Sequence, residues 1–350
     1  MKQITFILLL LTQVGFSQSS TSGIIEKIEF EGDTVKAVFD WVTDNIRYDV
    51  GKLNNIKKGK KPFKKGKYKN AEEYEKARLE KVIRTKKGVC EDYSLLFHEI
   101  LTELGYKSFI VTGLSKKKGK VDRTGHAWNA VFVDGSWKLY DATWGAGYVK
   151  EGKRFVKKYF PQWFETDPNV MVESHFPYDP IWQLSENPMT YDDFEKGNQP
   201  TASESPFDYN GLIEAYFTQE RKAQLQGELS RLESYGGKTR LIRERKQRLE
   251  GMINSKDLSV IMEKFKESNQ KFSEYYNEGK NKRFKGDVWT VDYSKSVLTE
   301  IKENLEVAIV EFSNTKSTSS KANRAYKKNA SHSKKMLSRV EKELEYLESL

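Results

Sequence analysis

Three residues of the chain, Cys90, His126 and Asp141, have side chains that together suit nucleophilic catalysis. A cysteine attacks an acyl carbon as its thiolate, which a helix N-terminus and a nearby protonated imidazole both favour. A histidine can take the thiol proton and later give it to a leaving amine, while an aspartate holds the ring in the required tautomer. Cys90 is the only cysteine of the chain, so no intramolecular disulfide accounts for it.

The sequence around Cys90 predicts that the thiol lies at the start of a buried helix. Apolar residues recur at helical spacing from Glu91 to Leu104, and Gly105 fits the position that ends a helix. Backbone N–H groups in the first turn of a helix have no partner within the helix, so the N–H of Cys90 is a candidate to stabilise an oxyanion.

A predicted hairpin brings the histidine to the aspartate. Residues 126–133 and 137–143 are typical of strands, and Asp134-Gly135 between them is typical of a two-residue turn. In that register His126 is a diagonal neighbour of Asp141, at a Cα separation of roughly 7 to 8 Å. A helix followed by an antiparallel sheet indicates the α+β class. Spacing alone does not bring Cys90 to His126, so that contact depends on the fold.

The three residues lie in longer motifs, which are Gly88-Val89-Cys90-Glu91-Asp92-Tyr93, Gly125-His126-Ala127-Trp128-Asn129 and Tyr140-Asp141-Ala142-Thr143-Trp144-Gly145. In order and spacing these motifs resemble the transglutaminase-like superfamily, which has a papain-like fold. The region from Tyr159 to Leu184 is similar to the branch that contains the kyphoscoliosis peptidase and its bacterial secreted relatives. The resemblance covers about half of the chain.

The resemblance implies a Cys-His-Asp triad that transfers acyl groups through a thioester. Cys90 is then the nucleophile, His126 the base and Asp141 the residue that orients the ring. The expected activity is that of a cysteine peptidase or a protein-glutamine acyltransferase acting on peptide or isopeptide amides, and the sequence does not choose between them. The alternative is a catalytically inactive transglutaminase-like module for binding or assembly, with a helical interaction arm.

Composition divides the 350 residues into three parts. Residues 1–18 combine an apolar run with small residues near its end, which is typical of a secretory signal peptide. Residues 24–200 are the predicted transglutaminase-like domain, with N-terminal helices and an antiparallel sheet. Residues 201–350 contain no proline after Tyr209 and alternate Lys and Glu with sparse apolar residues. This last pattern predicts an all-α helical bundle or coiled-coil-like domain.

The helical domain carries no catalytic motif, so we expect a scaffold or a partner-binding arm. Its helices are expected to break at Gly236-Gly237, near Asn254-Ser255, around residues 279–286 and at residues 317–320.

The chain carries a formal net charge of +10, part of it in the basic run of residues 57–69. Such a run is typical of a solvated loop, which could attract an anionic wall polymer, a membrane surface or an acidic protein. Two interpretations therefore stay open. One is a cell-envelope partner bound through this loop or the helical domain, and the other is a loop without function. The expected substrate is a protein or peptide. Nucleic acid is not expected, since no recognition module is present.

The predicted signal peptide indicates a secreted or periplasmic protein exported by a bacterium. No stretch reaches about 18 consecutive apolar residues, so no transmembrane segment is predicted. We expect no cofactor and no metal site, because no HExxH or CxxC pattern occurs and the four histidines are scattered. His98, His175 and His332 lack any supporting motif and are interpreted as core or surface residues.

Overall fold

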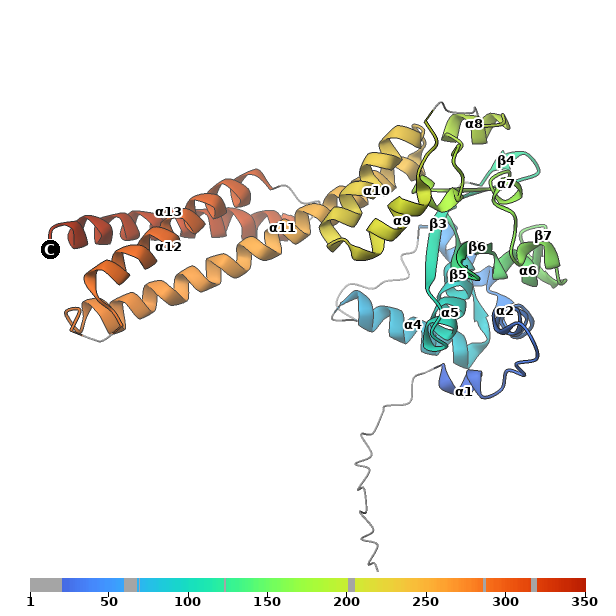
Figure 1. Cartoon of the computed structure of the whole chain (residues 1–350), viewed down its shortest axis with the longest axis horizontal. Coiled ribbons are helices and arrows are strands. Elements are labelled where there is room, and N and C mark those ends of the chain that lie inside the picture. The colour runs from blue at the N-terminus through green and yellow to red at the C-terminus, as the bar shows by residue number, and fades with distance from the viewer. Residues whose placement is uncertain are drawn as a thin grey trace, which may run out of the picture. The chain divides into compact units, whose positions relative to one another are not determined.

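Figure 1 shows the computed structural model of the chain, which describes residues 21–59, 68, 70–122, 124–200, 205–285, 288–315 and 320–350. The chain divides into two compact units. The first contains the described residues up to Glu214 together with Tyr235–Gly237, and the second contains Ala215–Ser234 and Lys238–Leu350. The predicted signal peptide and most of the basic run lie outside the described residues, and the predicted domain boundary between residues 200 and 201 stays a prediction.

The first unit begins with helices. The helices that begin at Thr34, Val50 and Ala71 each start where a polar side chain caps the first turn; for example, Asp33 accepts the N–H of Lys36 and Asn70 accepts the N–H of Glu73. A short parallel strand pair lies between later helices. The elements are α1 (Ser22–Ile25), α2 (Thr34–Asn45), β1 (Arg47–Tyr48), α3 (Val50–Lys57), α4 (Ala71–Thr85), β2 (Lys87–Gly88) and α5 (Cys90–Glu103).

An antiparallel sheet follows α5, in the strand order β4-β3-β5-β6 with β9 beside β3. The predicted hairpin register is confirmed, because Phe132 pairs with Trp137. Asp134 and Gly135 take φ values of 50° and 77°, which suit a two-residue turn. The strands are β3 (Ser108–Lys117), β4 (Lys120–Val121), β5 (His126–Val133), β6 (Ser136–Tyr140) and β9 (His175–Pro177).

The last strand of the hairpin is shorter than predicted. It was expected to reach Thr143, but β6 ends at Tyr140 because Asp141 caps the helix α6 (Ala142–Ala146). The region between this helix and residue 200 holds short elements. They are β7 (Gly147–Lys150), β8 (Arg154–Lys157), η1 (Pro161–Trp163), α7 (Pro168–Met171), η2 (Pro180–Gln183) and α8 (Tyr191–Lys196).

Apolar side chains pack on both faces of the sheet of the first unit, as strand alternation requires. Val131 and Tyr140 belong to one core, with α2 and α5, in which Phe39 and Phe97 are fully buried. The neighbouring Ala130 and Leu139 belong to a second core that includes Trp128, Ile181 and Trp182. Burial on both faces fixes the register, because a slip by one residue would exchange the two sets. The register in turn fixes the place of His126 and Asp141.

The second unit is helical, as predicted. Its long helices share a core that includes Phe272, Leu298 and Val340. The predicted break near Asn254-Ser255 is wrong, because α11 continues through it; Asn and Ser each cost at most about 0.7 kcal/mol in a helix, which packing overcomes. Helix α9 crosses the boundary between the two units. The helices from there to the C-terminus are α9 (Tyr209–Thr218), α10 (Arg221–Tyr235), α11 (Arg240–Glu274), the π-helical η3 (Tyr275–Lys280), α12 (Val291–Asn314) and α13 (Ser320–Glu348).

None of the helices in the described ranges has both the length and the apolar content needed to cross a membrane.

Candidate active site

Cys90 is the first residue of the 14-residue helix α5, as the sequence predicts. Its side chain is nearly enclosed, with 8% of the residue exposed. The preceding residue, Val89, is extended and donates its backbone N–H to Asp92 at 2.7 Å, which starts the helix. The thiol therefore lies at the positive end of the helix dipole, a position that favours a thiolate.

Two acidic residues follow Cys90 directly, and cations balance both. Asp92 is buried and lies 2.5 Å from the Lys52 Nζ and 2.5 Å from the Arg78 Nε. Burial alone would raise the pKa of Asp92, but the charges of Arg78 and Lys52 hold it below its usual range. Glu91 pairs with Arg78 at 3.0 Å. The negative charge that these residues would place beside a Cys90 thiolate is therefore offset.

The close packing at position 88 requires a glycine. A Cβ atom at this position would come within 2.5 Å of the Cβ of Asp92, a distance that real structures do not allow. Glycine at 88 therefore lets the strand β2 pass close to the carboxylate that caps α5.

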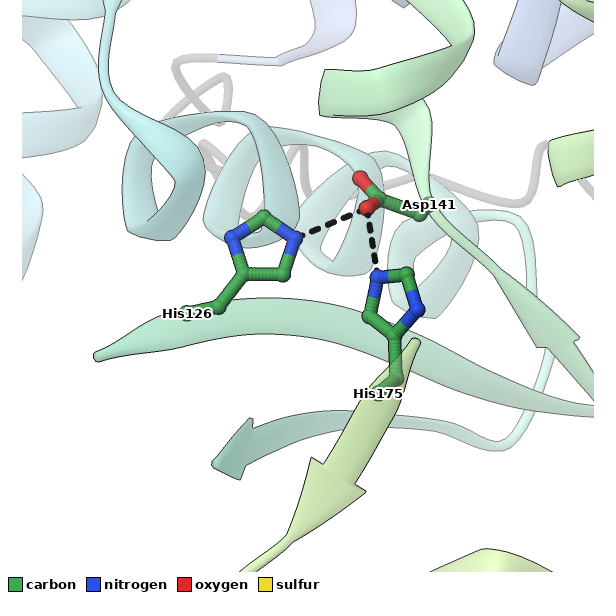
Figure 2. A group of neighbouring side chains, drawn as sticks. All are labelled: His126, Asp141 and His175. Atoms are coloured by element: carbon green, nitrogen blue, oxygen red, sulfur yellow. Dashed lines mark hydrogen bonds and ion pairs between the residues drawn. The ribbon is translucent and has the colours of Figure 1, made fainter. Parts of the chain in front are cut away.

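His126 and Asp141 meet where strand β5 begins and strand β6 has just ended. The Nε2 of His126 lies 2.8 Å from the Oδ2 of Asp141, as Figure 2 shows. Cys90 also interacts with the His126 ring and contributes to raising its pKa. Since Nε2 faces Asp141, Nδ1 is the nitrogen left for the thiol. The structure thus brings together the three residues that sequence spacing alone could only partly connect, and their catalytic role stays a prediction.

The carboxylate of Asp141 is fully buried and surrounded by donors. Its Oδ1 accepts the backbone N–H groups of Thr143 at 2.8 Å and Trp144 at 3.0 Å. Its Oδ2 lies against His126 and, at 3.0 Å, against the Nε2 of His175. Burial would raise the pKa of Asp141, but the charge of His126 and the hydrogen bonds from both histidines hold it well below its usual range. Asp141 is therefore ionised.

The two imidazoles on this carboxylate differ in charge. Burial would lower the pKa of His126, but the charge and hydrogen bond of Asp141, with a contribution from Cys90, raise it to about 9. For His175 burial outweighs the hydrogen bond and charge of Asp141, and the charges of His126 and Lys117 add to it, so the pKa falls to about 4. At neutral pH His126 is protonated and His175 is neutral.

His175 corrects the sequence interpretation, which left it as an unsupported core or surface residue. It lies on β9, which pairs with β3 in the register Ser115↔His175. The stretch His175-Phe176-Pro177 was part of the family resemblance, and that was the available signal. No spacing rule links a residue to a carboxylate 34 positions earlier, because the pairing of β9 with β3 is long-range.

Aromatic side chains surround the histidines. The ring centroids of Trp128 and Trp144 lie 6.0 and 5.5 Å from that of His126. Tyr48 is the polar neighbour of Cys90: burial, followed by the charge of Cys90, raises the pKa of the phenol. The tyrosine therefore stays neutral and does not compete with His126 for the thiol proton.

A metal ion is the other group that such a cluster could hold. Among the described residues, donor atoms of His126, Asp141 and His175 lie within 4.8 Å of one another. The distances of 2.8 and 3.0 Å from the two ring nitrogens to Oδ2 are those of hydrogen bonds. We therefore interpret the cluster as a hydrogen-bonded network, and the expectation of no metal stays a prediction.

Comparison with known proteins finds similarity in the first unit. Residues 20–160 match the family model of the transglutaminase-like domain. The human kyphoscoliosis peptidase is 29% identical over 204 residues, which cover 56% of this chain and 28% of that protein. Hillarin of Drosophila melanogaster is 28% identical over 132 residues, 33% of this chain and 16% of that protein. A solved structure described as a TGase is 20% identical, with a TM-score of 0.29, and covers 62% of this chain and 47% of that one.

Residues 20–160 are thus similar to the transglutaminase-like domain, in agreement with the resemblance seen in the sequence. The fold of the chain, an α+β domain with an antiparallel sheet followed by a helical region, agrees with the expectation from sequence. The chain spans less than a third of the length of the two curated relatives. The peptidase activity in the name of the first relative is therefore a statement about that protein.

Proposed function

We propose that this chain is a thiol enzyme that transfers acyl groups from peptide or isopeptide amides through Cys90, His126 and Asp141. The observation that carries the proposal is the His126 ring, which lies 2.8 Å from the Oδ2 of Asp141 and whose pKa, against the effect of burial, is raised by Asp141 and, to a smaller extent, by Cys90. The similarity of residues 20–160 to the transglutaminase-like domain, and of the chain to a protein named as a peptidase, supports it.

The first half of the reaction forms a thioester. The Cys90 thiolate attacks the amide carbonyl carbon, and the resulting oxyanion is stabilised by N–H groups of the first turn of α5. The protonated Nδ1 of His126 then gives its proton to the leaving amine as the C–N bond breaks. Asp141 keeps its charge throughout and holds the Nε2–H of the ring.

The second half releases the acyl group. Water or a primary amine attacks the thioester carbon, neutral His126 takes the proton of the attacking group, and the C–S bond breaks to restore the thiolate–imidazolium pair. Water gives a peptidase, whereas an amine gives a transglutaminase-type enzyme. The same three residues serve both outcomes.

Trapping the intermediate tests the proposal. The full chain is mixed with p-nitrophenyl acetate, and the acetylated residue is located by peptide mass spectrometry. We expect one acetyl group on Cys90, absent in Cys90→Ala and much slower to form in His126→Ala. An unmodified Cys90 in the folded wild-type protein would overturn the proposal and favour the inactive binding module. Discharge of the acyl-enzyme with and without a primary amine then separates the two enzyme types.

Export and an envelope partner belong to the same proposal. Residues 1–18 would direct the chain out of the cytoplasm, and the basic run of residues 57–69 or the helical unit would attract an anionic partner at the cell envelope. N-terminal sequencing of the protein recovered from medium or periplasm tests the first part. A mature protein that still begins at Met1 would contradict it.

A further inference from the structure

We propose that His175 is a positioning residue, which fixes the Asp141 carboxylate by hydrogen bonding and moderates its attraction for the His126 ring. The inference deepens the proposed function and rests on it, because it concerns how Asp141 serves the pair of His126 and Cys90. The carrying observation is the 3.0 Å contact between the His175 Nε2 and the same carboxylate oxygen that receives His126 (Figure 2).

With His175 in place, the carboxylate has no free acceptor position. An ionised carboxylate has about four lone-pair sites. Here two backbone N–H groups occupy the sites on Oδ1, and the two imidazole N–H groups occupy those on Oδ2. A carboxylate held by four donors cannot rotate, so the direction of the His126 ring is set by a rigid group.

The tautomer of His175 follows from its other neighbour. The Oγ of Ser174 lies 2.8 Å from the Nδ1 of His175. A neutral ring has one donor and one acceptor nitrogen. Since Asp141 only accepts, Nε2 carries the proton and Nδ1 accepts the hydroxyl of Ser174. The low pKa of His175, about 4, is consistent with this neutral form. His175 therefore donates a hydrogen bond without adding a charge.

The packing around His175 keeps it neutral and in place. The residue is 1% exposed, and the rings of Trp144, Trp128 and Trp163 have centroids 4.5, 5.0 and 5.2 Å from its own. The strand that carries it fits closely, because a Cβ on Gly113 would come within 2.1 Å of the Phe176 carbonyl oxygen. Such a tightly enclosed ring is suited to hold a partner in a fixed direction.

A neutral donor on the shared oxygen has a chemical consequence for His126. A hydrogen bond from His175 withdraws electron density from the carboxylate and lowers its ability to stabilise a protonated ring. Without it, the full charge of Asp141 would favour the His126 imidazolium more strongly. An imidazolium that is too stable gives up its proton to a leaving amine reluctantly. His175 thus keeps His126 suitable as an acid.

The titration of His126 tests this inference independently of catalysis. Histidine NMR spectra are recorded against pH for the full chain with Cys90→Ala, alone and combined with His175→Phe or His175→Gln. Phe keeps the bulk but removes the donor, whereas the Nε2 of Gln can replace that of the imidazole. His332→Gln is the matched control in the second unit. The charged or titratable groups facing the two rings are Asp141, Lys117 and, in the wild type, Cys90.

We expect His175→Phe to raise the pKa of His126 by about half a unit to one unit, and His175→Gln to return it to within a few tenths of the parent value. In the parent, the ring nitrogens of His175 should show a neutral Nε2–H tautomer at pH 7. An unchanged His126 titration in both variants would overturn the inference, as would one bound divalent metal ion per chain in the parent that His175→Gln abolishes.

Acetylation of Cys90 by p-nitrophenyl acetate gives the second readout, in chains that retain the cysteine. We expect His175→Phe to slow acetylation about tenfold at saturating ester without changing the half-saturating concentration, because the His126 ring is no longer held in a fixed direction. The alkaline limb of the pH profile should move upward with the pKa of His126. Since p-nitrophenolate leaves without a proton, this rate reports the positioning of His126. Gln should restore most of the rate. Equal losses in Phe and Gln with an unmoved limb would mean packing only and would overturn the inference. A shifted His126 titration in a chain whose Cys90 never reacts would overturn the proposed function and leave the positioning role standing.

Discussion

Both compact units bury a carboxylate among hydrogen-bond donors, but the donors differ in kind. Asp141 in the first unit receives two imidazoles and two backbone N–H groups. Glu343 in the second unit receives the hydroxyl groups of Tyr275 at 2.9 Å and Tyr276 at 2.6 Å, and the Nζ of Lys280 at 2.6 Å. Burial alone therefore does not distinguish a reactive cluster from a structural one.

The two clusters differ in the kind of group that could exchange a proton, which is an imidazole in the first unit and a phenol in the second. Burial, followed by the hydrogen bond to Glu343, raises the pKa of both tyrosines, and Glu343 itself stays ionised because Lys280 and the tyrosines oppose the effect of burial. In the first unit the pKa of His126 is about 9 and that of His175 about 4. The Glu343 cluster is thus suited to tie α13 to η3, whereas the Asp141 cluster is suited to move protons.

Replacing Asp141 should give the largest effect. In Asp141→Asn the neutral amide no longer stabilises the His126 imidazolium and permits the wrong ring tautomer, so we expect the acetylation rate of Cys90 to fall about 10²- to 10⁴-fold. Stopped-flow release of p-nitrophenol measures the rate. The matched amide substitution in the second unit, Glu343→Gln, should leave it unchanged. Equal rates for Asp141→Asn and the wild type would break the contrast between the two clusters.

Acid should destabilise the first unit through His175. Burial lowers the pKa of His175 from 6.5 to about 4, so its contribution to stability is complete above pH 6.5 and is lost as the pH falls toward 4. The difference corresponds to at most about 3 kcal/mol. Urea unfolding at several pH values should show a steeper loss in the wild type than in His175→Gln. Parallel pH dependences would contradict the neutral, buried state of this ring.

Glu343→Gln should act on stability alone. The variant loses the ion pair with Lys280 and weakens two tyrosine hydrogen bonds, so we expect the free energy of unfolding of the second unit to fall by about 1–3 kcal/mol. Urea titration followed by circular dichroism at 222 nm measures it. An unchanged midpoint would mean that the cluster does not hold α13 to η3.

An exposed ion pair in the same unit should matter least. The Nζ of Lys271 lies 2.7 Å from Glu300, and their side chains are 40% and 52% exposed. Solvent screens such a pair, so Lys271→Ala should change the free energy of unfolding by less than about 1 kcal/mol. A larger loss than that caused by Glu343→Gln would show that burial of the carboxylate is not what gives the Glu343 cluster its importance.

Local patterns predicted the parts of the site that depend on neighbouring residues. The helix that begins at Cys90 follows from apolar spacing, and the contact of His126 with Asp141 follows from a two-residue turn and strand alternation. The contact between Cys90 and His126 joins α5 to β5, and the sequence supported it only through the resemblance to a known fold.

The missed features depend on long-range packing or on competition between local signals. His175 reaches Asp141 because β9 pairs with β3, which no local pattern specifies. The strand expected to end at Thr143 stops at Tyr140 because Asp141 both caps α6 and binds the histidines. The helix break expected at Asn254-Ser255 is absent because packing of α11 outweighs weak local preferences.

The most direct test of the central claim is the pH dependence of Cys90 alkylation by iodoacetamide in the folded full chain. If His126 supports a thiolate, the wild-type protein should react at pH 6 at least about tenfold faster than His126→Ala, whose rate should rise only near pH 8.5 as for an unassisted thiol. A second inflection near pH 9 should mark the loss of the His126 proton. Superimposable profiles for the two proteins would contradict the account.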